Sequence, residues 1–391
     1  MKEVVILSAV RTPIGAFLGA FKDVPAPKLA ATAIKAAVAK AGIDPKEIDE
    51  CLMGSVLTAG MGQAPARQAM IFAGLPQSVC ATTLNRVCGS GLKSVMLAAQ
   101  AIQCGDADLV VAGGMENMSR TPFLLDRVRE GYRLGNGKVI DSMINDGLWD
   151  VYNNVHMGDC AELCSREKKV SREDQDKFAK ESYTRALNAI EAGKFKDEIS
   201  PVEITTNKGT TVFENDEEPF RAKLDKFDEL KPAFKKDGTV TAANSSSLSD
   251  GAAALVVCSA DYANKKGLKP IARILAQASF AQDPQWFTTA PVGAVKKLLE
   301  KSGKKVADID LFEVNEAFST MVLACGRELG LDKKKVNIRG GAVALGHPIG
   351  ASGARILTTL IHALRQEKKK LGVASLCIGG GEASALLVEA L

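Results

Sequence analysis

The same order of expected strands and helices occurs twice along this chain of 391 residues. Apolar segments typical of buried strands lie at 4–7, 51–57 and 107–112, and again at 271–275, 310–314 and 373–378. Stretches that open at a proline and close at a glycine, such as 27–42 and 291–303, separate these segments and predict helices. Strands that alternate with helices favour an α/β fold with layered sheets. We therefore expect two duplicated halves, each a mixed sheet covered by helices.

A segment of different texture, 120–249, separates the two halves. It contains a helix signal that begins at Ser171 and runs to Gly193, followed by polar and lysine-rich stretches. The run 250–258 then resumes the first half as its last strand. We expect three units: a first half at 1–119 and 250–268, an inserted loop domain at 120–249, and a second half at 269–391. An insertion of this size typically carries binding surface.

The segment 85–91 places Cys88 where an apolar run gives way to a helical stretch. Gly89 and Gly91 predict a sharp strand-to-helix turn. A thiol at the positive end of a helix has a lowered pKa, which favours the reactive thiolate. The alternative is a buried cysteine that acts as a small apolar side chain.

Two later segments of the second half resemble parts of the first half. Gly346-His347-Pro348 precedes a helix, as the Cys88 segment does, and Cys377 ends a strand before three glycines. We expect glycine turns at 113–114 and 379–381 to correspond. An imidazole and a second thiol are thereby predicted to accompany Cys88.

Composition excludes several classes of function. The net charge is only +4 and no long basic run occurs, so nothing indicates nucleic acid. Nine cysteines without a CxxC pair predict reduced thiols and a cytoplasmic protein. Three histidines and no Cys/His cluster predict no metal site. The acidic N-terminal segment predicts no targeting leader, and no apolar run is long enough for a membrane span.

The motifs together resemble the thiolase family, in particular its short-chain, biosynthetic-type members, over essentially the whole chain. The matching segments are VCGSG at 87–91, GGMENMS at 113–119, HMG at 156–158, NEAF at 315–318, the run 340–353, and CIGGG at 377–381. The resemblance implies an αβαβα layered architecture built from the two halves. It also implies that the inserted loop domain binds coenzyme A.

Joining two acyl thioesters requires a nucleophile, a base that activates it, and a second acid/base for a carbon-bound proton. Cys88 supplies an acyl-accepting nucleophile and His347 the base. Cys377, with a thiol pKa of about 8.5, could remove and return a proton near neutral pH. A loop histidine bonded to backbone and a strand-end cysteine are the structural alternatives.

By resemblance, the N–H groups of Cys88 and Gly379 form one oxyanion hole, and His347 with a water held by Asn315 forms the other. Asn315 as a plain helix cap is the alternative. Glu116 and Glu316 are structural candidates.

The resemblance also implies contacts with the coenzyme. They map onto His156, Met157, Arg221, Phe234, Ala243, Ser246, Ala317 and Phe318. The sequence departs from the family pattern at 241–247, at 286–291, in a shortened 221–234 segment, and at Glu382-Ala383, where the family has a glycine. These departures bear on substrate fit and not on the catalytic set.

We expect an acyltransferase that reversibly condenses two acetyl-CoA to acetoacetyl-CoA and CoA, by a Claisen condensation through an acetyl-cysteine. It would need no cofactor, since the CoA thioester is the substrate. One alternative is a degradative thiolase for longer 3-ketoacyl-CoA, and another is a non-catalytic CoA- or lipid-binding protein. Family members are commonly homotetramers, and 127–147 is a plausible assembly loop.

Overall fold

The computed structural model describes residues 2–207 and 209–391. Its strands are β1 (Val4–Arg11), β2 (Gly15–Ala16), β3 (Glu50–Gly54), β4 (Cys80–Leu84), β5 (Leu109–Asn117), β6 (Phe123–Leu125), β7 (Val139–Asp141), β8 (Trp149–Asp150), β9 (Val155–His156), β10 (Val202–Thr206), β11 (Gly209–Phe213), β12 (Ser249–Ser259), β13 (Ala272–Ala281), β14 (Leu311–Val314), β15 (Leu371–Ile378) and β16 (Glu382–Ala390). Its α-helices are α1 (Ala26–Ala41), α2 (Pro65–Phe72), α3 (Ser90–Cys104), α4 (Met157–Glu167), α5 (Arg172–Glu191), α6 (Glu218–Arg221), α7 (Ala260–Lys266), α8 (Ala290–Ser302), α9 (Ser319–Leu329), α10 (Ala342–Leu345) and α11 (Ser352–Gln366).

The sheet topology confirms two halves with the same strand order. The first half runs β1-β12-β5-β3-β4 and the second runs β13-β16-β15-β14. In place of a fifth strand, the second half has a parallel bridge between Phe312 and Val336. The two runs meet where β1 pairs antiparallel with β13. Strand β12, expected as the last strand of the first half, pairs with β1 and β5.

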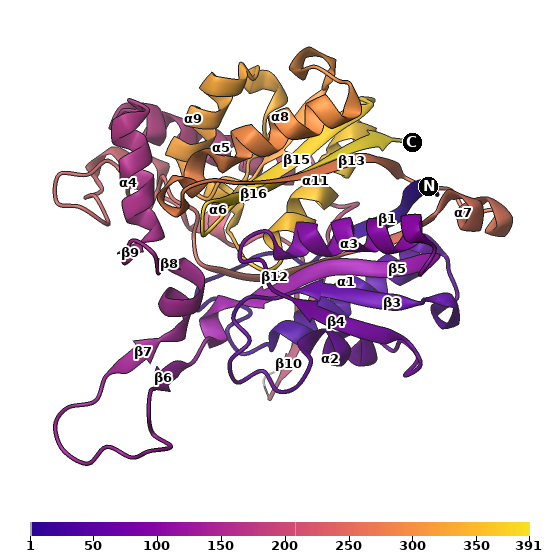
Figure 1. Ribbon diagram of the computed structural model, residues 1–391, viewed down its shortest axis with the longest axis horizontal. Helices are drawn as coiled ribbons and strands as arrows, with labels where there is room; N and C mark the ends of the chain where they lie inside the picture. Colours follow the sequence, from indigo (N-terminus) through magenta and orange to yellow (C-terminus); the bar gives the residue numbers. More distant parts are fainter. Residues whose placement is uncertain (1, 208) are drawn as a thin grey trace.

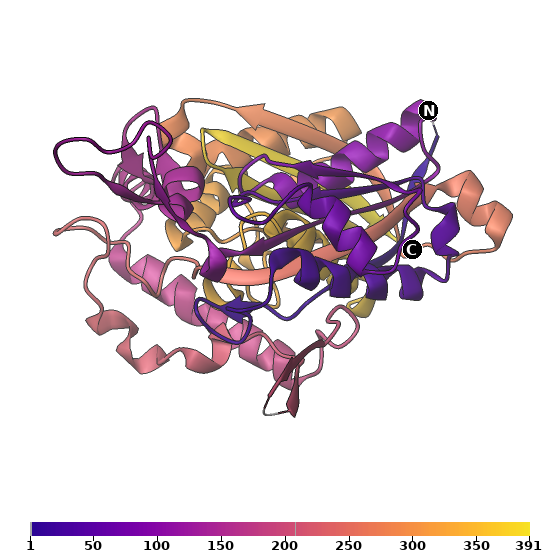
Figure 2. The same ribbon diagram turned by 90° about the horizontal axis from the view of Figure 1, so that it is seen from below.

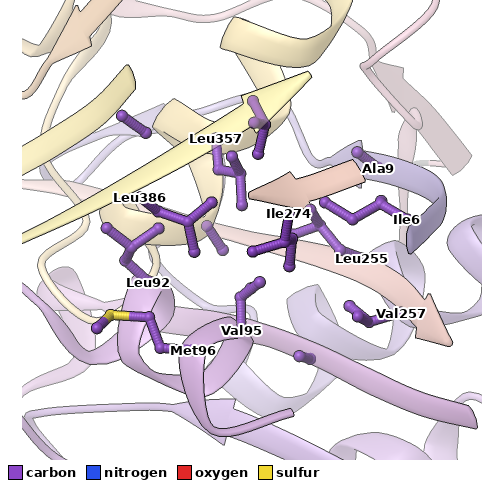
Figure 3. Packing of buried hydrophobic residues seen from close by; sticks show 14 of the residues in the cluster. Ile6, Ala9, Leu92, Val95, Met96, Leu255, Val257, Ile274, Leu357 and Leu386 are labelled. Atoms are coloured by element: carbon purple, nitrogen blue, oxygen red, sulfur yellow. The ribbon is translucent and has the colours of Figure 1, made fainter. Parts of the chain in front are cut away.

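The halves stack into the αβαβα layers expected of the fold (Figure 1). Helices α1 and α2 cover the outer face of the first sheet, and α8 and α9 cover the outer face of the second. Helices α3 and α11 lie between the sheets. Figure 3 shows the core of this middle layer, where Leu92 and Val95 of α3 and Leu357 of α11 meet strand residues of both halves.

The two middle helices cross at their first turns through a pair of glycines. A Cβ on Gly91 of α3 would lie 2.8 Å from the backbone N of Ala354 on α11. A Cβ on Gly353 of α11 would lie 2.3 Å from the backbone N of Leu92 on α3. Only glycine permits this approach at either position. The crossing brings the loops that precede α3 and α11 to one place in the molecule.

Local sequence signals set the helix ends. Helix α1 contains Pro27 in its first turn and ends at Gly42, whose φ of 65° is left-handed. The Ser171 hydroxyl caps α5 by accepting the N–H of Asp174 at 3.0 Å. The expected glycine turn at 113–114 is wrong, because β5 runs straight through these residues. A Cβ on Gly113 would lie 2.0 Å from the carbonyl oxygen of Ala253 on β12, so glycine serves close strand packing there.

The segment 120–249 lies along one end and one side of the layers, seen in purple to salmon in Figures 1 and 2. It contributes α4, α5 and α6, and the hairpin β6–β7 extends away from the body. Within the described ranges 2–207 and 209–391, no helix has the length and apolar character that crossing a membrane requires.

Candidate active site

Cys88 lies in a tight turn between β4 and α3. Val87, directly before it, has a φ of 44°, which is unusual for a β-branched residue and marks local strain. Side chains hold the turn: the Asn85 Oδ1 accepts the Val87 N–H at 2.8 Å, and the Ser90 Oγ accepts the Arg86 N–H at 2.8 Å. The elbow is therefore present, but its left-handed residue is Val87 and not a glycine.

Gly89 and Gly91 are needed for space instead. Gly89 has an ordinary helical φ of −79°. A Cβ there would lie 2.3 Å from Cδ1 of Ile378, at the end of β15. Gly91 is the crossing residue of α3. Both glycines thus let the second half approach the Cys88 turn.

The Cys88 thiol experiences two opposing influences. Burial raises its pKa to about 11, while the N–H groups of Gly379 and of Cys88 itself act to lower it. The expectation that the helix start lowers the pKa of Cys88 is therefore wrong for the protein without substrate, because the effect of desolvation on the pKa outweighs that of the nearby N–H donors. The same two N–H groups are those predicted for an oxyanion hole, and the structure directs both at the sulfur.

His347 lies in the loop between α10 and α11. Its Nδ1 lies 2.6 Å from the Ser352 Oγ, and its Nε2 lies 3.4 Å from the Asn315 Nδ2. Burial, followed by the positive charge of Arg355, lowers the pKa of His347 to about 3. The imidazole is therefore neutral near pH 7, which leaves one ring nitrogen without a proton, although the same burial disfavours its protonation in the protein without substrate. Ser352 was not singled out from the sequence, although a hydroxyl at the start of the next helix is a natural partner for a loop histidine.

Asn315 directly follows β14 and is fully buried. Its Oδ1 has no hydrogen-bond partner among the residues that the structure describes. A buried amide oxygen without a partner is costly unless a ligand or a water donates to it. Asn315 thus has an acceptor available beside the His347 ring.

Cys377 lies at the buried end of β15. Burial, and next the charge of Cys88, raise its pKa well above the ordinary range. The expected value near about 8.5 is wrong for the free chain, since desolvation stabilises the protonated thiol. Cys377 therefore holds its proton until another group changes its surroundings. It lies close enough to Cys88 for the two thiols to interact electrostatically.

A cavity of about 460 Å³ opens at Cys88 and His347. Six of the eight predicted coenzyme contacts line it: His156, Met157, Phe234, Ser246, Ala317 and Phe318. The other two differ. Ala243 packs into a neighbouring cluster, and Ala242 lines the cavity in its place. Arg221 is exposed at the end of α6, and the first residue of that helix, Glu218, lines the cavity.

Aromatic rings form one wall of the cavity. His156 stacks on Phe234 with ring centroids 4.9 Å apart, and Phe234 meets Phe318 edge-on at 6.3 Å. His156 also caps α4, because its Nδ1 accepts the Gly158 N–H at 3.0 Å. Its placement is therefore explained by helix capping as well as by lining the cavity.

A second wall of the cavity is apolar and was not predicted. It includes Met118, Met143 and Ile349, which cluster with Val56 and Leu57. Their wide spacing in the sequence leaves no local signal.

Buried Glu116 holds the loops of this wall together. It accepts backbone N–H groups from Val56 at 3.0 Å, Leu57 at 3.1 Å and Gly350 at 3.0 Å. It therefore ties the segment after β3 to the loop that carries His347. The structural role expected for Glu116 fits these contacts.

Two family profiles match the chain: "Thiolase, N-terminal domain" over residues 4–261 and "Thiolase, C-terminal domain" over residues 268–390. The chain is 53% identical to the acetyl-CoA acetyltransferase of Cupriavidus necator H16, with 100% of both chains covered. It is 52% identical to the acetyl-CoA acetyltransferase of Escherichia coli K12, again over 100% of both chains. It superposes on the crystal structure of the Bacillus anthracis acetyl-CoA acetyltransferase with a TM-score of 0.98 and 44% identity, covering 100% of this chain and 99% of that one.

Proposed function

The chain belongs to the thiolase family, and from that premise we propose that it reversibly condenses two acetyl-CoA to acetoacetyl-CoA and free CoA. One observation carries the proposal: Cys88 and His347, from opposite halves, line the same cavity, and two backbone N–H groups are directed at the Cys88 sulfur. This is the arrangement that acyl transfer to a thiol requires.

The first step forms an acetyl-enzyme. Neutral His347 takes the thiol proton of Cys88 as the sulfur attacks the acetyl carbonyl of the first substrate. The N–H groups of Cys88 and Gly379 stabilise the negative charge that develops on the carbonyl oxygen. The bond to CoA then breaks, and the leaving CoA thiolate receives the proton from His347. The low pKa of His347 favours this return of the proton.

The second step forms the carbon–carbon bond. Neutral His347 takes the proton of Cys377, and the Cys377 thiolate removes a proton from the methyl group of the second acetyl-CoA. The resulting carbanion attacks the acetyl carbonyl on Cys88. The bond to Cys88 breaks, and its thiolate takes up the proton that His347 carries, which leaves both thiols protonated as at the start. We propose that His347 and a water held by the free Oδ1 of Asn315 stabilise the enolate oxygen; the unpartnered Oδ1 supports this role.

A short acyl group suits this site. The position that a Cβ on Gly379 would occupy lies 3.4 Å from the Met157 sulfur and 3.5 Å from Cγ1 of Val87, so these side chains line the space beside the Gly379 donor at ordinary contact distance. We propose that the segment 120–249, which supplies His156, Met157 and Phe234 to the cavity, holds the coenzyme. The exposed Arg221 would contact a phosphate at its outer end. No further cofactor enters the proposed reaction.

Separate removal of the two thiols tests this mechanism. Cys377→Ala should still be acetylated by radiolabelled acetyl-CoA, because that step uses only Cys88, His347 and the donors. It should lose exchange of the acetyl-CoA methyl protons with deuterated solvent, and turnover should fall by about 10²–10⁴-fold. Cys88→Ala should lose acetylation. Acetylation of Cys88→Ala, or near-normal condensation by Cys377→Ala, would refute the mechanism. A thiolysis assay across acyl lengths tests the short-chain assignment, and faster cleavage of longer 3-ketoacyl-CoA than of acetoacetyl-CoA would refute it.

We also propose a cytoplasmic homotetramer, a dimer of dimers. The hairpin β6–β7 and its connecting loop expose apolar side chains, among them Phe123, Leu134 and Val139, which supports burial of this hairpin against another copy. All nine cysteines are free, and six of them are buried, which suits a reducing compartment. Light scattering of the purified chain would measure its mass, and a monomer would exclude this assembly.

A further inference from the structure

The two N–H donors at the Cys88 sulfur come from opposite halves of the chain. One belongs to Cys88 in the turn before α3, and the other belongs to Gly379 in the turn between β15 and β16. No covalent segment nearby joins these turns. Catalysis by an oxyanion hole depends on donors held at a fixed separation, and a misplacement of about 1 Å can cost about 10²-fold in rate.

The Arg86 side chain is a direct polar link between the two turns. Its Nε donates to the Glu382 Oε2 at 2.8 Å, and its Nη1 donates to the Ser279 Oγ at 2.9 Å and to the Ser384 Oγ at 3.4 Å. Glu382 is the first residue of β16, directly after the glycine turn that contains Gly379. The guanidinium of a residue two positions before Cys88 is thus bound to strands of the other half.

The geometry at both ends makes this link able to position the donors. On one side, the Arg86 N–H is held by Ser90, so the backbone at the base of the side chain is fixed. On the other side, Gly380 and Gly381 have φ values of 90° and 84°, and both are therefore in the left-handed region. A turn with two such glycines is intrinsically permissive, and an anchor at its end restricts it.

Glu382 also belongs to one of the departures from the family pattern, the segment Glu382-Ala383, where the family has a glycine. The pair of Arg86 and Glu382 lies outside the catalytic set that the resemblance implies. It is partly exposed, with 21% of the Arg86 side chain and 36% of the Glu382 side chain accessible, so its removal is compatible with folding.

We propose that Arg86 and Glu382 are a positioning pair that sets the separation between the Cys88 sulfur and the Gly379 N–H during acyl transfer. The inference rests on the proposed function for its kinetic consequence, and on the structure alone for its effect on the free thiol. Neither residue touches the substrate in this role. Both act through the two turns that carry the donors.

The main test compares Glu382→Gln with the wild type. This variant keeps the shape of the side chain and removes the charge. A matched control is Glu389→Gln, which removes another partly exposed ion pair, the one between Arg273 of β13 and Glu389 of β16, away from the site. Lys93 lies close enough to Arg86 and Glu382 to interact with both charges. In Arg86→Gln, Lys93 would remain as a cation near Glu382, so this variant is less informative than Glu382→Gln.

Single-turnover acetylation of Glu382→Gln should be about 10-fold slower than that of the wild type. This loss is smaller than the factor of about 10² that a displacement of about 1 Å costs. The KM for acetyl-CoA should stay unchanged in steady-state assays. The rate of Cys88 alkylation by iodoacetamide should rise at higher pH than in the wild type, because the Gly379 N–H stabilises the thiolate less. The double variant Arg86→Glu with Glu382→Arg should restore most of the acetylation rate. Glu389→Gln should match the wild type in both measurements.

Two results would overturn the inference. One is a Glu382→Gln variant with the wild-type acetylation rate and alkylation profile, and the other is an equal loss in Glu389→Gln. If Glu382→Gln does not fold, Arg86→Lys, which keeps the charge but loses the guanidinium contacts to the serines, replaces it with the same expected direction. If the wild type itself is not acetylated, the proposed function fails, and the alkylation profile alone still decides the positioning pair.

Discussion

Replacement of Gly89 by alanine perturbs the separation of the two catalytic turns directly. The backbone of Gly89 is helical, with a φ of −79° and a ψ of −5°, so alanine is tolerated there without backbone strain. The new Cβ would lie 2.3 Å from Cδ1 and 2.9 Å from Cγ1 of Ile378. Carbon atoms in contact are ordinarily about 3.5–4.0 Å apart, so one side must move by at least about 1 Å.

Ile378 has little room to move. It is only 1% exposed, and it immediately precedes Gly379. Overpacking of a core usually costs about 1–3 kcal/mol, which we expect as the loss in free energy of unfolding for Gly89→Ala. Because the displacement falls between Cys88 and the Gly379 N–H, the rate of acetyl-enzyme formation should fall by about 10²-fold.

Urea denaturation and single-turnover acetylation followed by mass spectrometry measure the two effects. The control is Ile378→Val, which removes Cδ1 and alone should cost about 0.5–1.5 kcal/mol. Combined with Gly89→Ala it should recover part of the rate and stability, since the approach to Cγ1 remains. A Gly89→Ala variant with wild-type rate, or a double variant whose losses simply add, would refute the argument that the two turns are in contact here.

Two further predictions concern the titratable groups of Glu116, which is buried, and of Cys88, which is half-buried. Glu116→Gln should lower the free energy of unfolding by about 1–3 kcal/mol, because an amide NH₂ would face one of the three N–H groups that the carboxylate accepts. Burial raises the pKa of Glu116 from 4.5 to about 7, so the folded chain binds this proton more tightly than the unfolded chain does. The free energy of unfolding should therefore fall as pH rises from about 4.5 to about 7. Urea denaturation measured over a series of pH values should show a weaker dependence in Glu116→Gln. For Cys88, whose pKa is about 11, the rate of alkylation should increase with pH across the alkaline range, and acetyl-CoA should protect the thiol from the reagent. The exposed Cys80 and Cys104 should be alkylated whether or not acetyl-CoA is present. A rate for Cys88 that is already constant near pH 7 would contradict the dominance of burial.

The architecture could be predicted because its signals are local. Prolines and glycines bound helices such as α1 and α8, and apolar runs mark the buried strands. Repetition of this order in both halves then indicated the duplication, whereas the strand neighbours were known only from the structure. The turn expected at 113–114 was wrong for a physical reason: Gly113 is small because β12 passes close to it, and such a contact across the sheet leaves no trace in the neighbouring residues.

The site was less accessible from sequence, because its properties come from burial and from distant contacts. The position of Cys88 before a helix suggested a lowered pKa, but desolvation depends on what the second half places around the thiol. The same applies to Cys377. The link from Arg86 to Glu382 joins two loops that no pattern connects, and only the folded chain shows that the departure at Glu382 has a partner.

The glycine crossing of α3 and α11 has the geometry of an interface between identical subunits. Gly91 of one helix meets residue 354 of the other, and Gly353 in return meets residue 92. Such reciprocity, in which the same patch is used on both sides, defines an isologous contact and is the mark of a two-fold dimer. Here both partners belong to one polypeptide. A true homodimer would have to repeat every residue at its two-fold axis, whereas this fused version is free to place a thiol on one side of the junction and an imidazole on the other.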